Sequence, residues 1–185
     1  MSHRWIVTVI GKDRPGIVAG VTKVLYQLGC NLEDSAMTRL ESEFTIMLIF
    51  EAPARVTAQR LQQAFAVISR TLGLTVHLKQ LSSQESRAPA SGGRRYMISV
   101  YGADHPGIVY RVSERLAKAK VNILDVHTHR TASGRGRGKA SLYMLLLDVE
   151  LPARQSPEAL DRALRQLAKR LGVEVNLRAS EANVL

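Results

Sequence analysis

Hydrophobic patterns of strand and helix type alternate along this chain in a regular order. Residues 5–10 form a short apolar run of strand length that ends at a Gly/Pro turn, and apolar residues then recur at helical spacing from Ile17 to Leu28. Strand patterns follow over 31–39 and 44–50, then a second helical stripe from Leu61 to Leu72 and a last strand over 75–79. The predicted order is βαββαβ.

The same pattern occurs twice. Val9–Val18 recurs 91 residues later as Val100–Val109, and the register continues to Arg39 and Arg130 with 12 identities in 31 positions. The second copy predicts strands over 96–101, 122–130, 142–149 and 174–178, with helical stripes from Ile108 to Leu116 and from Leu160 to Leu171. After Arg130 the offset rises to 99, which indicates eight extra residues around 131–139.

The repeat predicts two domains, over 1–80 and 94–185, joined by a linker over 81–93 that is rich in Ser, Pro and Gly. The βαββαβ order is that of a ferredoxin-like α+β fold, an antiparallel four-stranded sheet with both helices on one face. In the runs over 45–50 and 142–147 both alternating faces are apolar. Because helices cover only one face, we expect the other to be covered by the other domain or by a second chain, so a homo-oligomer is expected.

Composition and net charge limit the expected cellular location and the kinds of partner. The single Cys30 excludes an intrachain disulfide framework and a Cys-based zinc cluster, which favours a reducing, cytoplasmic location. No apolar run approaches the roughly 18 residues of a membrane span, and none resembles a secretory signal. The net charge is +10, and the second half is the more basic, with 16 basic against 9 acidic residues over 91–185. Such charge favours encounter with polyanions or acidic proteins without specifying either.

The repeated turn after the first strand, Gly-x-Asp-x-Pro-Gly-Ile-Val, can serve structure or binding. On the structural interpretation, Asp13 caps or charge-complements the following helix and Pro15 lies in its first turn, and Asp104 and Pro106 have these roles in the second copy. On the binding interpretation, the free N–H groups at the helix start receive a carboxylate, and the glycine lets a ligand approach the backbone.

These turns, the Asn-[Leu/Ile]-x-Asp step that starts the second strand and the βαββαβ order together resemble the ACT domain, a small regulatory module that binds amino acids. The tandem pair, covering essentially the whole chain, resembles the glycine cleavage system transcriptional repressor family. In ACT domains the ligand lies where the first loop of one domain meets the second strand of a neighbour. The resemblance implies as ligand-binding residues Asp13, Pro15, Gly16 and Ile17 with Asn31 and Leu32, and Asp104, His105, Pro106, Gly107 and Ile108 with Asn122 and Ile123.

The chemistry of these side chains agrees with an amino-acid ligand. Asn31, Asn122, Asp34 or Asp125 can accept a hydrogen bond from an α-ammonium group, although each Asn also suits a turn. At roughly 1.5 kcal/mol per heavy atom, a ligand of glycine's size reaches a Kd of a few micromolar at best. Arg14 stands where the second copy has His105, so one copy can bind while the other only scaffolds.

Other candidate sites are weaker. His127 and His129 share one face of a strand, but no third ligand cluster accompanies them, so no metal and no cofactor are expected. Arg135, Arg137 and Lys139 lie in the Gly-rich insertion, either as a partner contact or as a solvated loop. No catalytic motif is recognisable, so an enzyme is not expected.

We therefore predict a non-enzymatic regulator that senses a small amino acid such as glycine and acts on a transcription regulator by protein contact. One alternative is a basic ferredoxin-like module that binds nucleic acid. It is disfavoured because RNA-recognition motifs need stacking aromatics on their central strands, and here the third strands are mainly aliphatic. Another alternative is a regulatory subunit of a metabolic enzyme.

Overall fold

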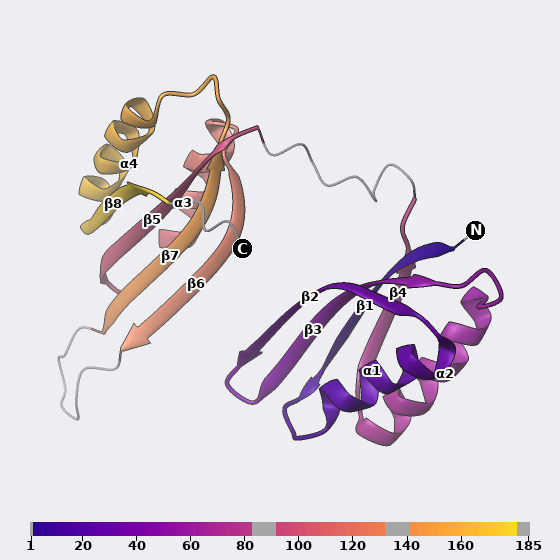
Figure 1. Ribbon diagram of the computed structural model, residues 1–185. Coiled ribbons are helices and arrows are strands. Elements are labelled where there is room, and N and C mark those ends of the chain that lie inside the picture. The colour runs from indigo at the N-terminus through magenta and orange to yellow at the C-terminus, as the bar shows by residue number, and fades with distance from the viewer. Residues whose placement is uncertain (1, 83–91, 132–140, 181–185) are drawn as a thin grey trace. The chain divides into compact units, whose positions relative to one another are not determined.

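The computed structural model describes residues 2–82, 92–131 and 141–180 and divides the chain into two compact units, 1–89 and 90–185. Most of the expected linker, and all of Arg135, Arg137 and Lys139, lie outside the described residues. Over the described residues, each unit has four strands and two helices in the order βαββαβ, as predicted (Figure 1). Among the described residues no helix is both long enough and apolar enough to cross a membrane.

The first unit consists of β1 (His3–Lys12), α1 (Ile17–Leu28), β2 (Asn31–Leu40), β3 (Glu43–Ala52), α2 (Ala58–Leu72) and β4 (Thr75–Gln80). The antiparallel sheet has the order β2-β3-β1-β4. The second unit repeats this with β5 (Arg94–Ala103), α3 (Ile108–Lys118), β6 (Asn122–Thr131), β7 (Leu142–Leu151), α4 (Pro157–Leu171) and β8 (Val173–Ala179), in the sheet order β6-β7-β5-β8. The fold class is α+β and ferredoxin-like, which confirms the prediction.

Both helices of each unit cover one face of its sheet (Figure 1). In the first unit, the residue pairs Trp5/Phe50 and Val7/Leu48 lie opposite each other on that face, and all four side chains are buried. They pack in one core with the apolar stripes of both helices, which include Ile17, Val21, Leu25, Leu61 and Phe65. The period-2 and period-3.6 patterns therefore meet in a single layer between sheet and helices.

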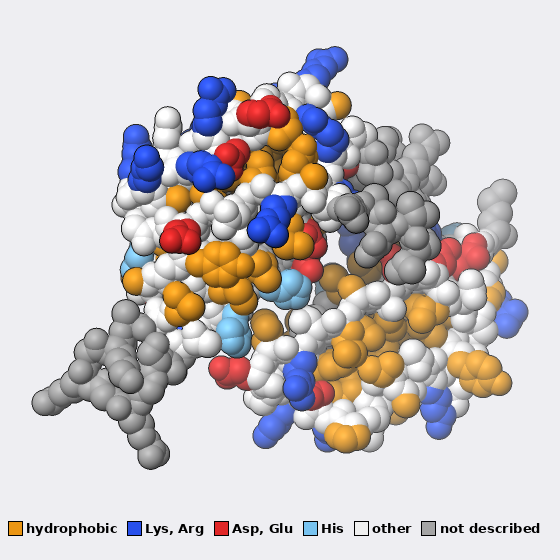
Figure 2. Space-filling model, turned by 60° about the vertical axis from the view of Figure 1, so that its left-hand side comes forward, with side chains coloured by type: hydrophobic (Ala, Val, Ile, Leu, Met, Phe, Trp, Pro, Cys, Tyr) orange, Lys and Arg blue, Asp and Glu red, His pale blue; other side chains and the backbone are white. Residues whose placement is uncertain are grey.

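The opposite face of each sheet carries exposed apolar side chains. In the first unit Ile10, Leu40 and Met47 are at least 44% exposed, and in the second unit Met97 and Leu142 are exposed to a similar degree. Hydrophobic side chains accordingly reach the surface of both units (Figure 2). The sequence correctly indicated a second apolar face on each sheet, and what covers it stays a prediction.

Candidate functional site

The repeated turn joins β1 to α1 at the end of the sheet where β2 turns into β3. The backbone N–H of Asp13 donates a hydrogen bond to the Ser42 carbonyl at 2.7 Å, which ties the turn to the β2–β3 connection. In the second unit Asp104 makes the matching bond to the Ser141 carbonyl at 3.0 Å. The two turns are therefore held in the same way.

The start of the helix differs from the structural interpretation. Gly16 is the N-cap of α1, in a left-handed conformation with φ of 95°, and no side chain caps the helix there. Pro15 thus precedes the helix rather than lying in its first turn, and Asp13 is not the cap. Gly107 takes the same role for α3 with φ of 99°, so Pro106 and Asp104 are displaced likewise. The reason is geometric: a left-handed residue is needed to turn the chain into the helix, and glycine adopts that conformation without strain.

The carboxylate of Asp13 instead pairs with a cation from the edge strand. Arg39 Nη1 lies 3.3 Å from Asp13 Oδ2, and in the second unit Arg130 Nε lies 2.9 Å from Asp104 Oδ2. Neither arginine is among the site residues predicted from the sequence. The available signal was their identity at the last matched position of the repeat, 26 residues after the aspartate.

In the first unit the turn borders a cavity of about 680 Å³ between α1 and the edge strand β2. Its lining includes Asp13, Pro15, Gly16 and Ile17, together with Met37 and Arg39. Four of the predicted site residues therefore lie together around one hollow. Its charged groups are the carboxylate of Asp13 and the guanidinium groups of Arg14 and Arg39, beside the positive end of α1, whose first turn contains no acidic residue. The lining also includes Thr22, whose hydroxyl donates a hydrogen bond to the Val18 carbonyl at 2.8 Å.

Asn31 and Leu32 lie at the other end of the same sheet. They begin β2 and pair with Glu51 and Phe50 near the end of β3, whereas the turn contacts the beginning of β3. Asn122 and Ile123 have the same position in β6, where they pair with Glu150 and Val149. Within one unit, then, the predicted strand residues do not join the predicted loop residues.

The aspartate of the Asn-x-x-Asp step has a local role. The β2–β3 register shifts between Leu32 and Asp34, and Asp34 Oδ1 accepts a hydrogen bond from the Ser35 N–H at 2.7 Å. Asp125 accepts the matching bond from Val126 at 2.8 Å beside the same irregularity in β6. These carboxylates stabilise a bulge in an edge strand, which re-aims the residues on either side of it.

His105 distinguishes the second turn from the first. Its Nε2 lies 2.8 Å from the Leu171 carbonyl at the end of α4, and its Nδ1 lies 3.1 Å from the Pro106 carbonyl. Since carbonyl oxygens only accept, both contacts require a protonated ring nitrogen, and the Leu171 contact foremost raises the pKa of His105. Neighbouring Asp104 adds to this rise.

The histidine pair predicted to share one face of a strand lies in β6. His127 and His129 both lie on the open face of β6, and His127 Nε2 lies 2.9 Å from Asp125 Oδ2. Within residues 2–82, 92–131 and 141–180, no three His, Cys, Asp or Glu side chains are grouped so as to hold a metal ion.

The nucleic-acid alternative requires aromatic side chains that stack bases on an open sheet face. In β3, Phe44 and Phe50 are buried in the core and so are not placed to do this.

Comparison with known proteins agrees with this architecture. A family model described as the ACT domain matches residues 3–79 and again 94–178. The chain belongs to the ACT domain family. Its two ACT domains cover most of the sequence, and family resemblance and fold are therefore both confirmed.

Several known proteins match this chain along most of its length. The glycine cleavage system transcriptional repressor of Escherichia coli (strain K12) is 28% identical over 180 residues, which is 96% of this chain and 88% of that protein. A crystal structure of an unknown protein from Galdieria sulphuraria matches with a TM-score of 0.82 and 24% identity, over 98% of this chain and all of that one. A structure provisionally assigned to a glycine cleavage system transcriptional repressor matches with a TM-score of 0.74 and 16% identity, over 98% and 99%. The homology and the ACT domains support a regulatory role.

Proposed function

We propose that this protein is a non-enzymatic sensor of a small amino acid that adjusts transcription of the glycine cleavage system by contacting a transcription regulator. The cavity beside the first turn is the observation that carries the proposal. It places the carboxylate of Asp13 beside the guanidinium of Arg39, so each charged group of a zwitterion has an opposite charge to meet.

Binding would proceed by exchange of partners. The α-carboxylate takes the Arg39 guanidinium and the free N–H groups at the start of α1, and the α-ammonium takes the Asp13 carboxylate. The existing ion pair is exposed on the arginine side and is therefore inexpensive to open. Asn31 and Leu32 would complete the site only when supplied by a neighbouring ACT domain, which is how a homo-oligomer would contribute to sensing.

The first domain is the better candidate for the sensor. Arg14 lines its cavity, whereas the matched His105 is engaged with two backbone carbonyls. The second domain would then act mainly as scaffold, with Asp104, Gly107 and Ile108 keeping the turn in shape. If only the first domain binds, calorimetry should give one binding site per chain.

Calorimetric titration of the full chain with glycine, serine and the other common amino acids tests the proposal. A saturable micromolar-to-millimolar signal is expected for one of them, and Asn31→Ala is expected to weaken it. Transcripts of the glycine cleavage genes should then respond to that amino acid only in cells that carry this protein. Silence across the amino-acid panel would refute the sensor.

A further inference from the structure

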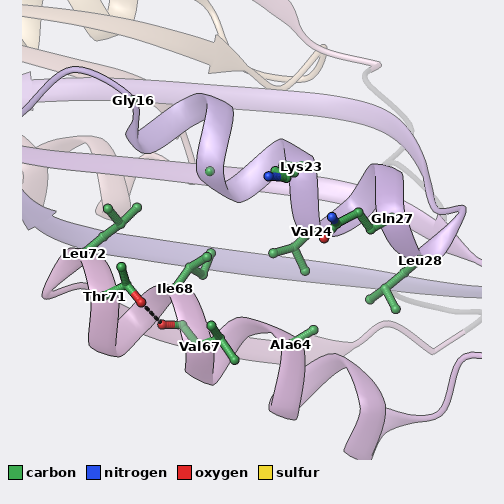
Figure 3. Close-up of a pocket in the computed structure, with 11 residues that line it drawn as sticks. Gly16, Lys23, Val24, Gln27, Leu28, Ala64, Val67, Ile68, Thr71 and Leu72 are labelled. Atoms are coloured by element: carbon green, nitrogen blue, oxygen red, sulfur yellow. Dashed lines mark hydrogen bonds between the residues drawn. The ribbon is translucent and has the colours of Figure 1, made fainter.

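A second hollow in the first ACT domain runs between its two helices. This groove, of about 510 Å³, is lined from α1 and α2 and is formed largely by apolar side chains. Figure 3 shows Val24 and Leu28 of α1 pointing towards α2, and Ile68 and Leu72 of α2 pointing back towards α1. At its surface Val67 is 55% exposed, so apolar area remains open to solvent along the groove.

Three polar side chains, those of Lys23, Gln27 and Thr71, line this groove. Lys23 is the charged residue in the lining, and the Thr71 hydroxyl already donates to the Val67 carbonyl at 2.9 Å. Neither helix contains an Asp or Glu, and α2 adds Arg60 and Arg70 on its exposed surface. The groove is therefore mainly apolar, and the charged residues on the two helices that form it are all basic.

The second domain has the same topology, so its residues can be compared with those that line the groove at the matched positions. Its helices carry Arg111, Arg115, Gln166 and Arg170 at the positions matched to Gly20, Val24, Val67 and Thr71. All four of these side chains are exposed. Since the fold forms equally well with polar residues at these positions, the apolar groove of the first domain is not a requirement of the fold.

We propose that the α1–α2 groove docks an amphipathic helix of another protein, one whose apolar stripe is flanked by Asp and Glu. A groove along the 12 residues of α1 extends roughly 18 Å, which suits about three helical turns. The acidic flanks would meet Lys23 in the lining and would be attracted by Arg60 and Arg70 on the exposed surface of α2. A second copy docked through its own helices is disfavoured, because α1 and α2 carry three basic and no acidic residues, and α3 and α4 carry seven basic against three acidic.

This inference rests on the protein-contact part of the proposed function and gives that contact a surface. The groove and the amino-acid cavity lie along the same helix: Gly16 lines both, Ile17 and Thr22 line the cavity, and Gly20 and Val24 line the groove. A displacement of α1 on amino-acid binding would therefore reach the groove directly. That is the physical link a sensor requires between effector and partner.

Selection from a displayed library of helical peptides of about four turns tests the docking surface. The full chain is the target, and a Lys23→Glu/Val67→Gln double variant, which imports the second domain's residues at two exposed positions, is the counter-target. We expect enrichment of peptides with apolar residues at i, i+3 or i+4 and i+7 and with acidic neighbours. Their affinity should fall at least about tenfold in the double variant.

Tyr26→Ala is the matched control, since Tyr26 is 84% exposed on α1 and does not line the groove, and it should change affinity less than about twofold. The proposal is overturned if no peptide distinguishes the chain from the double variant, if the enriched peptides are basic, or if Tyr26→Ala weakens them equally. It is also overturned if Val67→Gln abolishes self-association, or if only a small apolar anion such as anilinonaphthalene sulfonate binds. Amino-acid calorimetry on the double variant separates the two proposals, because the cavity residues are unchanged in it.

Discussion

Arg39 Nη1 lies 3.3 Å from Asp13 Oδ2, joining an edge strand to the turn that precedes the first helix. The second domain repeats the relationship between Arg130 and Asp104 at 2.9 Å. In the first domain this pair lies in the lining of the cavity, so the two charges that an amino acid would engage are already held beside each other. Preorganisation of this kind reduces the ordering cost of binding.

Replacing Arg39 by Gln is expected to weaken amino-acid binding by about 10- to 100-fold, because one charge-assisted hydrogen bond to the carboxylate is lost. The side chain is 65% exposed, so the free energy of unfolding should change by less than about 1 kcal/mol. Calorimetry measures the first quantity, and chemical denaturation measures the second.

Arg130→Gln in the second domain is the matched control for that substitution. If the first domain is the sensor, Arg130→Gln leaves the titration unchanged. Equal weakening by both substitutions would instead show two equivalent sites. Undiminished binding in Arg39→Gln would place the carboxylate elsewhere.

Gly16 and Gly107 are expected to resist substitution for a purely conformational reason. A Cβ built on either residue meets no atom within 4 Å, yet both have φ above 90°. Gly16→Ala and Gly107→Ala should each lower the free energy of unfolding by about 1–2 kcal/mol. Gly92→Ala serves as control because it has open space and no positive φ. Denaturation midpoints that fall equally in all three variants would contradict this explanation.

The topology of the chain could be predicted because each element carries a clear period and the repeat presents each pattern twice. The site could be predicted only in part. Proline's preference for the first turn of a helix predicts that Pro15 lies inside α1. In the structure the left-handed Gly16 is the N-cap, so the helix begins at Ile17 and Pro15 precedes it. Arg39 joins the site through strand pairing, which no local motif encodes.

The groove between α1 and α2 is harder still to predict from the sequence. Val24 and Ile68 lie in different helices, and each fits an ordinary amphipathic stripe. Only the packing of α1 beside α2 reveals that they border one open channel. Sequence patterns report which face is apolar, whereas the depth of a hollow depends on how two faces meet.

Lys120 is expected to be a point of backbone strain. It has φ of 55° at the position matched to Gly29, whose φ is 69°. The left-handed conformation costs a non-glycine residue roughly 1–2 kcal/mol, and glycine's greater freedom in the unfolded chain offsets part of that difference. Lys120→Gly should therefore raise the free energy of unfolding by up to about 1 kcal/mol. Arg115→Gly, at an exposed position within α3, should lower it by about 1 kcal/mol, and the two variants are compared by denaturation.

His105 is expected to make the second domain less stable as pH rises. Its contacts with the Leu171 and Pro106 carbonyls, with Asp104 beside it, raise its folded-state pKa above the ordinary value of 6.5. A raised pKa means that the contribution to stability is fully present below about pH 6.5 and is lost as pH rises through the folded-state pKa. Imidazole titration by NMR should give a pKa above 6.5 for His105.

His105→Arg isolates this contribution because arginine, the residue at the matched position of the first domain, stays charged at every pH concerned. The melting temperature of the wild-type chain should fall between about pH 6 and pH 8.5 by more than that of His105→Arg. Both proteins share the other four histidines, so the difference between their pH profiles belongs to residue 105. Parallel pH profiles for the two proteins, or a His105 pKa below 6.5, would show that the ring is neutral in the folded state and that one of its carbonyl contacts carries no proton.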